Sequence, residues 1–496
     1  MTRFVRRPRG LGGLVGSALL LGCVIAGPPG AGEAMAQTGT IAPSLLTLRP
    51  VKAVSYQPSP SDDCLWQAKH CPNPNPTPTN PNNDATYFDS DFYNTDFANL
   101  WGKGSTSSGR NDLATIQASG ANLLHIYSWN PQRDHKSFLD AANVAKLKVM
   151  IPITNYTACT ISGGCQGIAP AKASYQAAYN VIKGTFNEIY ANSGNTPHPA
   201  AAVWSIFNEY DLNSIDPKNI AFAIQAILQL ETEASVTGAN RLPFVVPVSN
   251  AIHNQASGAQ PIYFANAEAL YLAMAGNASK TDATIPPGVL PIVALSVALQ
   301  NAATNATTSY QAAADATPVT VAAMPTDFWQ KRHIATVNPF SDGPTLNRYI
   351  IDGGKFQSAF PGANVTAGGI TWTAAWNSLP PLFFSESGVN ISGSAPGTSG
   401  TAQTQAAFVL KQLQCTIPWA VDATSTAQGY FLGTTIFEFS NEDANGRWGM
   451  FVFPKPVNFT TATTTGGATY RVDHLLAQPG WANVGTGFLA TAKTCL

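Results

Sequence analysis

The chain has 496 residues, of which only 11% are charged, and its 27 Lys and Arg nearly balance its 28 Asp and Glu. An average soluble domain is about 25% charged. The sequence therefore has no excess of positive charge that would attract nucleic acid or an anionic membrane, and we expect neither as a partner. Ten Trp, fifteen Tyr and many Asn, Ser and Thr instead suit a neutral polyhydroxylated ligand.

The N-terminus has the pattern of an export signal. Four Arg precede an apolar run over 11–26, and the small residues Ala34 and Ala36 flank Met35. This predicts a signal peptide over 1–36 and a secreted or periplasmic protein. An alternative is a lipobox that ends in Cys23, which would leave a lipid-anchored protein. No later segment reaches the about 18 uninterrupted apolar residues of a membrane span, so we expect none.

The seven cysteines suit an oxidising compartment. With Cys23 in the signal region six remain, and their spacing favours the disulfides Cys64–Cys71, Cys159–Cys165 and Cys415–Cys495, although six cysteines allow about 15 pairings. The sequence has no Cys-x-x-Cys pair and no His-Glu-x-x-His motif. We therefore expect no metal and no cofactor.

Short apolar runs alternate with longer helical patterns along most of the chain, which is typical of repeated βα units. Eight such runs predict a closed (β/α)8 barrel. The expected strands are Val51–Tyr56, Asn122–Tyr127, Lys148–Ile153, Ala202–Phe207, Phe244–Val248, His333–Val337, Pro381–Ser385 and Thr434–Phe439. The expected helices include Arg110–Ser119, Asp134–Lys146, Tyr175–Tyr190, Pro217–Val236 and Ala402–Leu413.

Other segments fit around this barrel, which we assign to 37–455. Residues from about 250 to 330 are too long for one βα loop, and they predict a mostly helical insertion between strands five and six. Proline excludes helix over 72–83, which we expect to be a loop. Residues 456–496 form a tail that we expect to pack on the barrel, with its end held by Cys495.

Two of the predicted strands end in a carboxylate. The run Val203–Phe207 is followed by Asn208 and Glu209, and the run Pro381–Ser385 by Glu386. Because C-terminal strand ends of a barrel meet at the active-site mouth, the two acids should face one another. Retaining cleavage of a glycosidic bond needs such a pair, one acid as nucleophile and one as acid/base. The acid/base must start protonated, which predicts a raised pKa at Glu209 from burial beside Trp204 or Phe207 and from the charge of Glu386.

These residues resemble the clan A glycoside hydrolases, which carry Asn-Glu at the end of strand four and Glu at the end of strand seven. Within the clan the chain is most similar to the β-1,3-glucanosyltransferases of glycoside hydrolase family 72, and next to family 17 β-1,3-glucanases. The similar segments are 51–58, 122–128, His135, 381–388, 436–442 and 448–450. The chain departs from the family at His125, Phe340 and Phe437, where the family has Arg, Tyr and Tyr, and it lacks a cysteine-rich C-terminal module.

The resemblance implies Glu209 as acid/base and Glu386 as nucleophile, with Asn208 on the substrate 2-hydroxyl. Further candidate substrate-binding residues are Tyr127, which could also orient the nucleophile, Gln57, Tyr56, Trp129, Phe340 and Glu438. Gln57 could instead be an exposed loop residue, Trp129 a packing residue and Glu438 a structural partner for an Arg.

The expected activity is that of a monomeric retaining hydrolase or transglycosylase acting on β-glucan, with β-1,3 linkage implied by the resemblance alone. Two alternatives stay open. One is a catalytically silent barrel that only binds carbohydrate, and the other is a clan A hydrolase for another β-linked polysaccharide.

Overall fold

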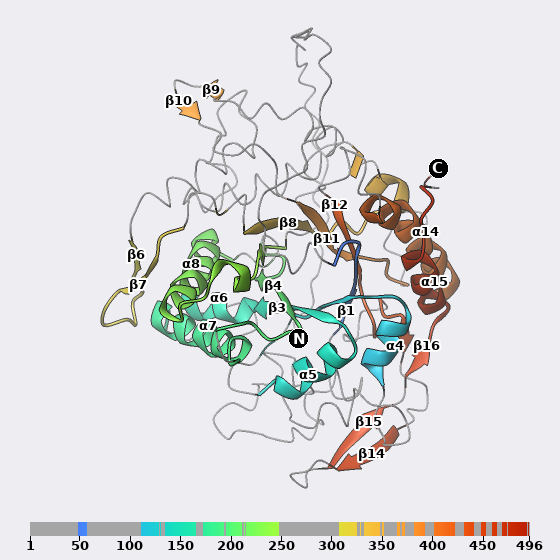
Figure 1. Ribbon diagram of the computed structural model, residues 1–496, viewed down its shortest axis with the longest axis horizontal. Helices are drawn as coiled ribbons and strands as arrows, with labels where there is room; N and C mark the ends of the chain where they lie inside the picture. Colours follow the sequence, from blue (N-terminus) through green and yellow to red (C-terminus); the bar gives the residue numbers. More distant parts are fainter. Residues whose placement is uncertain are drawn as a thin grey trace, which may run out of the picture.

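A computed structural model of the chain shows eight parallel strands closed into a barrel in the order β1, β2, β3, β4, β5, β8, β11, β12 (Figure 1). The strands are β1 (Val51–Ser55), β2 (Leu123–His125), β3 (Lys148–Ile153), β4 (Ala201–Ile206), β5 (Phe244–Val245), β8 (His333–Val337), β11 (Leu382–Ser387) and β12 (Phe431–Ile436). Each lies on one of the eight predicted runs, within a few residues. The predicted (β/α)8 fold is confirmed.

The structure describes residues 48–56, 111–127, 129, 134–164, 172–192, 195–210, 213, 215–247, 307–324, 328, 332–347, 350–351, 365–367, 370–372, 381–391, 401–421, 431–440, 448–452, 459–463, 469–473, 475–493 and 495. The predicted signal peptide, Cys23, Gln57, the Cys64–Cys71 disulfide and the loop over 72–83 lie outside these ranges. Among the described residues, no helix combines the length and apolarity needed to cross a bilayer.

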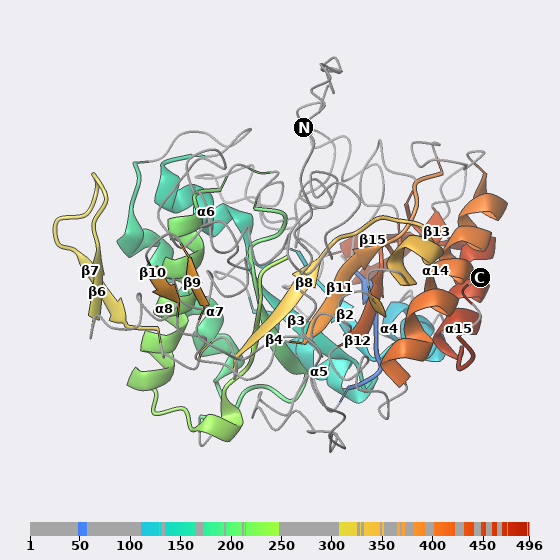
Figure 2. The ribbon, with the colours of Figure 1, turned by 90° about the horizontal axis from the view of Figure 1, so that it is seen from above.

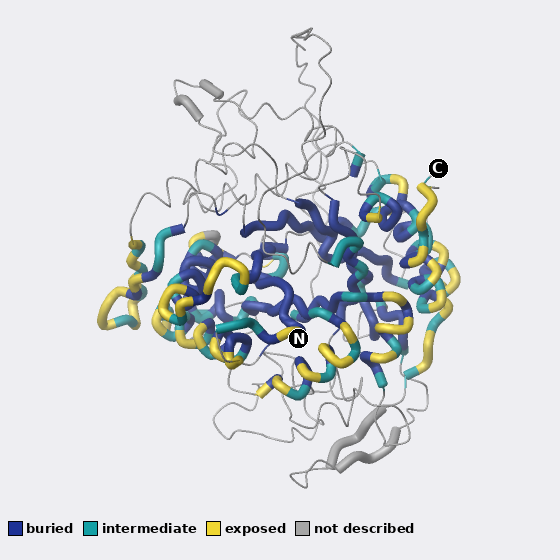
Figure 3. The backbone as a smooth tube through the Cα atoms, in the orientation of Figure 1, coloured by how far each residue is buried: buried dark blue, intermediate teal, exposed yellow. Residues whose placement is uncertain are grey.

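The strands are buried on both faces, as a barrel enclosed by helices requires (Figure 3). Side chains that point into the barrel alternate along most strands and fill it with apolar groups from every strand. These are Val51, Ala53, Leu123, Met150, Ala202, Val203, Val245, Ile334, Phe383 and Leu432. The residues between them, such as Val54, Leu124 and Trp204, belong to the larger core under the helices.

Helices cover the outside of the barrel. They are α4 (Asp112–Ala118), α5 (Lys136–Val144), α6 (Asn155–Ser162), α7 (Tyr175–Ile189), α8 (Pro217–Glu233), α14 (Ala402–Val421) and α15 (Pro479–Phe488). In both ribbon views α6, α7 and α8 lie on one side and α14 and α15 on the other (Figures 1 and 2). Ser174 and Asp216 cap α7 and α8 through their side chains.

The C-terminal region is more regular than a tail. It contains the hairpin β14 (Phe459–Thr463) and β15 (Thr469–Asp473), and a two-stranded pairing of β13 (Phe451–Val452) with β16 (Leu476–Ala477). The helix α15 then packs along α14. The predicted Cys415–Cys495 disulfide is present and fixes the chain end to α14. Cys159 is also disulfide-bonded, while its predicted partner Cys165 lies outside the described residues.

The insertion between the fifth and sixth barrel strands differs from the prediction in its described part. Residues 307–322 form an antiparallel hairpin of β6 (Thr307–Tyr310) and β7 (Val319–Ala322), whereas the sequence predicts a mostly helical insertion. The β-branched residues of these two runs favour strand, and Val319 and Val321 alternate with exposed Thr320 to give the hairpin one buried face. A second hairpin, β9 (Val365–Ala367) and β10 (Ile370–Trp372), follows the sixth barrel strand.

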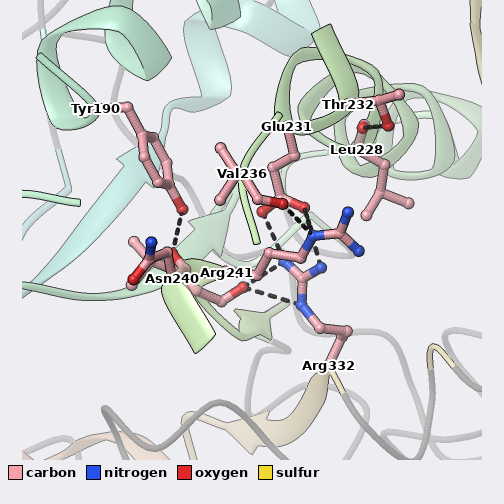
Figure 4. Close-up of polar contacts among 9 residues, drawn as sticks. Tyr190, Leu228, Glu231, Thr232, Val236, Asn240, Arg241 and Arg332 are labelled. Carbon is pink, nitrogen blue, oxygen red and sulfur yellow. Dashed lines mark hydrogen bonds and ion pairs between the residues drawn. The ribbon is translucent and has the colours of Figure 1, made fainter. Parts of the chain in front are cut away.

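A buried ion pair joins α8 to the start of β8 at the base of the barrel (Figure 4). Arg332 Nη1 and Nη2 donate to the Glu231 carboxylate, at 3.0 and 2.8 Å. Arg332 also donates to the Leu242 carbonyl at 2.6 Å, and Arg241 lies 3.7 Å from the same carboxylate. The Glu231 side chain is fully buried. Removing Arg332 would therefore leave a buried carboxylate without its main partner, which destabilises the folded state.

Candidate active site

Polar side chains gather where the barrel strands end. Asn208 and Glu209 follow β4, Asn338 follows β8, and Glu386 lies near the end of β11. Tyr127 follows β2 and Glu438 follows β12. These ends all open on the C-terminal face of the barrel, which is where barrel enzymes carry their active sites.

The turn after β4 is held in an unusual backbone conformation. Phe207 and Glu209 both have positive φ, at 54° and 47°, which costs a non-glycine residue about 1 kcal/mol or more. The side chain of Asn155 fixes this turn, because its Nδ2 donates to the Asn208 carbonyl at 2.9 Å and its Oδ1 accepts from the Asn208 amide at 2.7 Å. The Glu209 amide donates to the Pro247 carbonyl at 3.1 Å. These contacts fix the backbone positions of Asn208 and Glu209, from which the two side chains extend.

Two amide side chains connect the two acids. Asn208 Nδ2 donates to Glu386 Oε1 at 3.2 Å, and Asn338 Nδ2 donates to Glu209 Oε1 at 3.1 Å. The amides themselves meet where Asn338 Nδ2 lies 3.5 Å from Asn208 Oδ1. Residues 178 positions apart in the chain are therefore in one hydrogen-bonded group, as the strand-end pattern predicts.

Glu386 is the more buried of the two acids. It is 3% exposed, whereas Glu209 is partly exposed. Burial raises the pKa of Glu386 well above its usual value, and the negative charge of Glu209 raises it further. Hydrogen bonds from Tyr127 and Asn208 oppose this shift by favouring the ionised form. The raised pKa that the sequence predicts at Glu209 stays a prediction.

Close contact between β11 and β12 shapes the wall beside Glu386. A Cβ at Gly388 would lie 2.3 Å from the carbonyl oxygen of Phe437, so only glycine permits this approach. The Phe437–Glu438 peptide bond is cis. Glu438 is 3% exposed, and its charge is a further cause of the raised pKa of Glu386. Glu438, a candidate substrate-binding residue, thus lies close enough to Glu386 to affect its ionisation.

A wall of aromatic rings begins at Tyr127. Its ring lies 6.1 Å from that of Phe437, which lies 5.8 Å from Phe340 and 5.6 Å from Trp448. Phe340 and Trp448 are 5.0 Å apart. All four side chains are partly exposed. Phe340, a predicted substrate-binding residue, thus lies in a half-exposed aromatic surface next to the acids. Phe437 and Trp448 join it without having been assigned a binding role from the sequence.

Two other predicted substrate-binding residues point away from this face. Tyr56 is fully buried, and its hydroxyl donates to Asp112 Oδ2 at 3.0 Å. Trp129 is 1% exposed, stacks on His135 with ring centroids 4.0 Å apart, and donates its indole N–H to Glu188 at 3.0 Å. The predictions for Tyr56 and Trp129 are therefore corrected: both rings are covered by protein and have packing roles. Gln57 lies outside the described residues.

Asn338 is the residue of this group that the sequence analysis missed. Asn338 lies two residues before Phe340, which the sequence does single out. A polar residue directly after an apolar strand is the signal that also marks Asn208 and Glu386, and it could have found Asn338. Among the described residues, no group of three or more His, Cys, Asp or Glu is arranged to hold a metal ion.

No family model matches the chain, and no curated protein is similar to it in sequence. Solved structures similar to it include Gas2p of Saccharomyces cerevisiae in complex with laminaripentaose, with a TM-score of 0.39 and 10% identity. The match covers 77% of this chain and 58% of that chain. Another is ScGas2 in complex with a compound numbered 8, at a TM-score of 0.40 and 10% identity, covering 89% of this chain and 63% of that one. The chain thus spans less than two thirds of the length of these proteins. At such low TM-scores and sequence identities, the similarity says nothing about the function of this chain.

Proposed function

We propose that the protein is a retaining glycoside hydrolase or transglycosylase that acts on β-glucan, with Glu386 as nucleophile and Glu209 as acid/base. The observation that carries this proposal is the hydrogen-bonded group of two carboxylates and two amides at the mouth of a closed barrel. A protein that only binds sugar needs aromatic surfaces, but it has no need of an acid pair. The linkage, β-1,3, comes from the resemblance of the strand-end segments to family 72.

The proposed reaction has two steps. In the first, the Glu386 carboxylate attacks the anomeric carbon while Glu209 gives its proton to the departing glycosidic oxygen, which leaves a glycosyl ester on Glu386. In the second, Glu209 takes a proton from water or from a sugar hydroxyl, whose oxygen attacks the anomeric carbon and releases Glu386. Water gives hydrolysis and a sugar gives transfer.

The environment of each acid fits its proposed role. Tyr127 and Asn208 donate to Glu386, and these bonds favour the ionised form that a nucleophile requires. The negative charge of Glu209 also raises the pKa of Glu386, so the ionisation of one acid disfavours that of the other. The wall of Phe340, Phe437 and Trp448 offers ring faces and edges for the apolar sides of sugar rings.

The test is the turnover and binding of laminarin by the wild type and by Glu386→Ala. The proposal predicts that the variant loses turnover and keeps binding. If the wild type is as inert as the variant across β-1,3-, β-1,4- and mixed-linkage glucans, activity on β-glucan is refuted, and binding of laminarin without turnover supports the binding-only alternative. Sizing the products from a single β-1,3-oligosaccharide then separates the two reactions: products longer than the substrate mean transfer, and only shorter ones mean hydrolysis.

A further inference from the structure

Asn338 makes contacts with both halves of the site. It directly follows β8 and is fully buried. Its Nδ2 lies 3.1 Å from Glu209 Oε1 and 3.5 Å from Asn208 Oδ1. Its Oδ1 accepts a hydrogen bond from the Ser385 hydroxyl at 2.7 Å. Ser385 directly precedes Glu386, so Asn338 bridges the strand that carries one acid to the carboxylate of the other.

These partners determine which way the Asn338 amide points. With Nδ2 toward Glu209, a donor meets a carboxylate and the carbonyl end meets the Ser385 hydroxyl. The reverse orientation would place the amide oxygen against the Glu209 carboxylate, where two acceptors repel one another. Ser385 is itself held in place, because the His125 Nδ1–H donates to its main-chain carbonyl at 2.9 Å. Burial lowers the pKa of His125 to about 4, so the ring is neutral near neutral pH and the carbonyl selects the tautomer with a proton on Nδ1.

We infer that Asn338 is a positioning residue for acid/base transfer: its amide N–H holds Glu209 by Oε1 and so fixes the direction in which the carboxyl group presents its proton. This inference rests on the proposed function. A carboxyl group has two oxygens that can hold the proton, and only one of them can face the leaving group at a time. A fixed donor on Oε1 disfavours a proton on that oxygen and holds the plane of the carboxyl group, while Ser385 and His125 keep that donor in place.

The inference predicts a selective loss of acid assistance. Departure of a phenol depends on a proton from Glu209, whereas departure of 2,4-dinitrophenolate does not. Asn338→Ala removes both amide atoms. Asn338→Leu keeps the approximate volume of the side chain without either polar atom. In both variants we expect kcat/KM on a phenyl β-glycoside to fall on the order of 10- to 100-fold, and on the dinitrophenyl β-glycoside by less than about threefold, because general acid catalysis contributes about 100- to 10,000-fold in all.

Two serines of β11 provide a matched pair of further variants. Ser385→Ala removes the hydroxyl that holds Asn338, so it should change the phenyl-to-dinitrophenyl ratio in the same direction by a smaller factor. Ser387→Ala removes a buried hydroxyl from the same strand, one that contacts Thr434 Oγ1 at 3.1 Å and the Thr435 carbonyl at 2.7 Å. It should leave the ratio unchanged. Both hydroxyls are fully buried. The pair therefore distinguishes loss of the hydrogen bond from Ser385 to Asn338 from a general destabilisation of β11.

The experiment measures kcat and KM for both aryl glycosides with the wild type, the four variants and Glu209→Ala. A selective fall in kcat/KM for the phenyl glycoside in the Asn338 variants supports the inference, because kcat/KM reports the first step, in which the leaving group departs. Equal losses on both substrates, or a ratio that Ser387→Ala changes as much as Ser385→Ala, would overturn it. If thermal scans show that the Asn338 variants do not fold, the Ser385→Ala ratio decides. If the wild type is active and only Glu209→Ala changes the phenyl-to-dinitrophenyl ratio, this inference alone is overturned. If the wild type is inert on every glycoside, the proposed function is overturned as well.

Discussion

Removing one hydroxyl beside Glu386 should change the pH dependence of the reaction. Tyr127 donates a hydrogen bond to Glu386, and this bond lowers the pKa that burial and the charge of Glu209 raise. Its hydroxyl also lies 2.6 Å from Ser55 Oγ. The ring packs on His125 at 4.3 Å and on Phe437 at 6.1 Å, and phenylalanine would keep both contacts. Tyr127→Phe therefore removes a hydrogen bond with little change in packing.

The expected size of the effect comes from the charge on the acceptor. A hydrogen bond to a charged group contributes about 1.5–3 kcal/mol, and about 1.4 kcal/mol corresponds to a tenfold change in rate. Loss of this bond should lower kcat/KM by about 10- to 100-fold near neutral pH. It should also raise the pKa of Glu386, because the ionised form loses a donor. The nucleophile acts only when ionised, so activity is then lost at a higher pH as the solution is acidified.

The measurement is kcat/KM for the dinitrophenyl β-glycoside across pH, because this substrate reports attack by Glu386 without help from an acid. The acidic limb of the Tyr127→Phe profile should lie at higher pH than that of the wild type. Tyr190→Phe is the matched control: it removes a tyrosine hydroxyl that donates to the Asn240 carbonyl at 2.9 Å, at the base of the barrel (Figure 4). It should leave the profile in place. An acidic limb that stays or moves to lower pH in Tyr127→Phe would refute the role given to this hydroxyl.

Three further predictions concern stability and the second acid. Arg332→Met should lower the unfolding free energy by about 3–5 kcal/mol because Glu231 stays buried without its partner. The Arg241 side chain is 36% exposed, so Arg241→Met should lower it by less than about 1 kcal/mol. Urea unfolding measures both, and equal losses would contradict the description of this ion pair. Cys495→Ser should destabilise the protein by about 2–5 kcal/mol, because the disulfide closes a separation of 80 residues, and an unchanged melting midpoint without reductant would contradict this. Glu209→Ala should fail on poor leaving groups and give a β-glycosyl azide when azide is added, whereas an α-glycosyl azide would reverse the roles of the two acids.

The barrel could be predicted because its strands are apolar on both faces. Lys148–Ile153 and His333–Val337 fall where the sequence places them, since a strand enclosed by helices is an uninterrupted apolar run. Glu209 and Glu386 could be found for the same reason, as charged residues that end such runs. The hairpin over 307–322 was missed because a segment rich in Ala, Asn and Thr carries a weak signal for either helix or strand.

Side-chain direction was harder to predict. Residues alternate along a strand, so an error of one position reverses the face. In β1 the inward residue near the site is Ser55, which contacts Tyr127, and its neighbour Tyr56 packs under α4 instead. The face of Trp129 depends on a loop whose path no local pattern gives, and the burial of Glu386 depends on neighbouring strands and loops. Such properties follow from tertiary packing and are not visible in any short stretch of sequence.

The central claim is that Glu386 forms a covalent bond to the sugar. Incubating the protein with 2-deoxy-2-fluoro-β-laminaribiosyl fluoride provides the most direct test, because the 2-fluoro group slows both steps and the fluoride leaves without an acid, so the ester accumulates. Peptide mass spectrometry should then locate one fluorosugar on Glu386. A wild type that cleaves β-glucan while the label falls on Glu209, on Glu438 or on no residue at all would contradict the assignment.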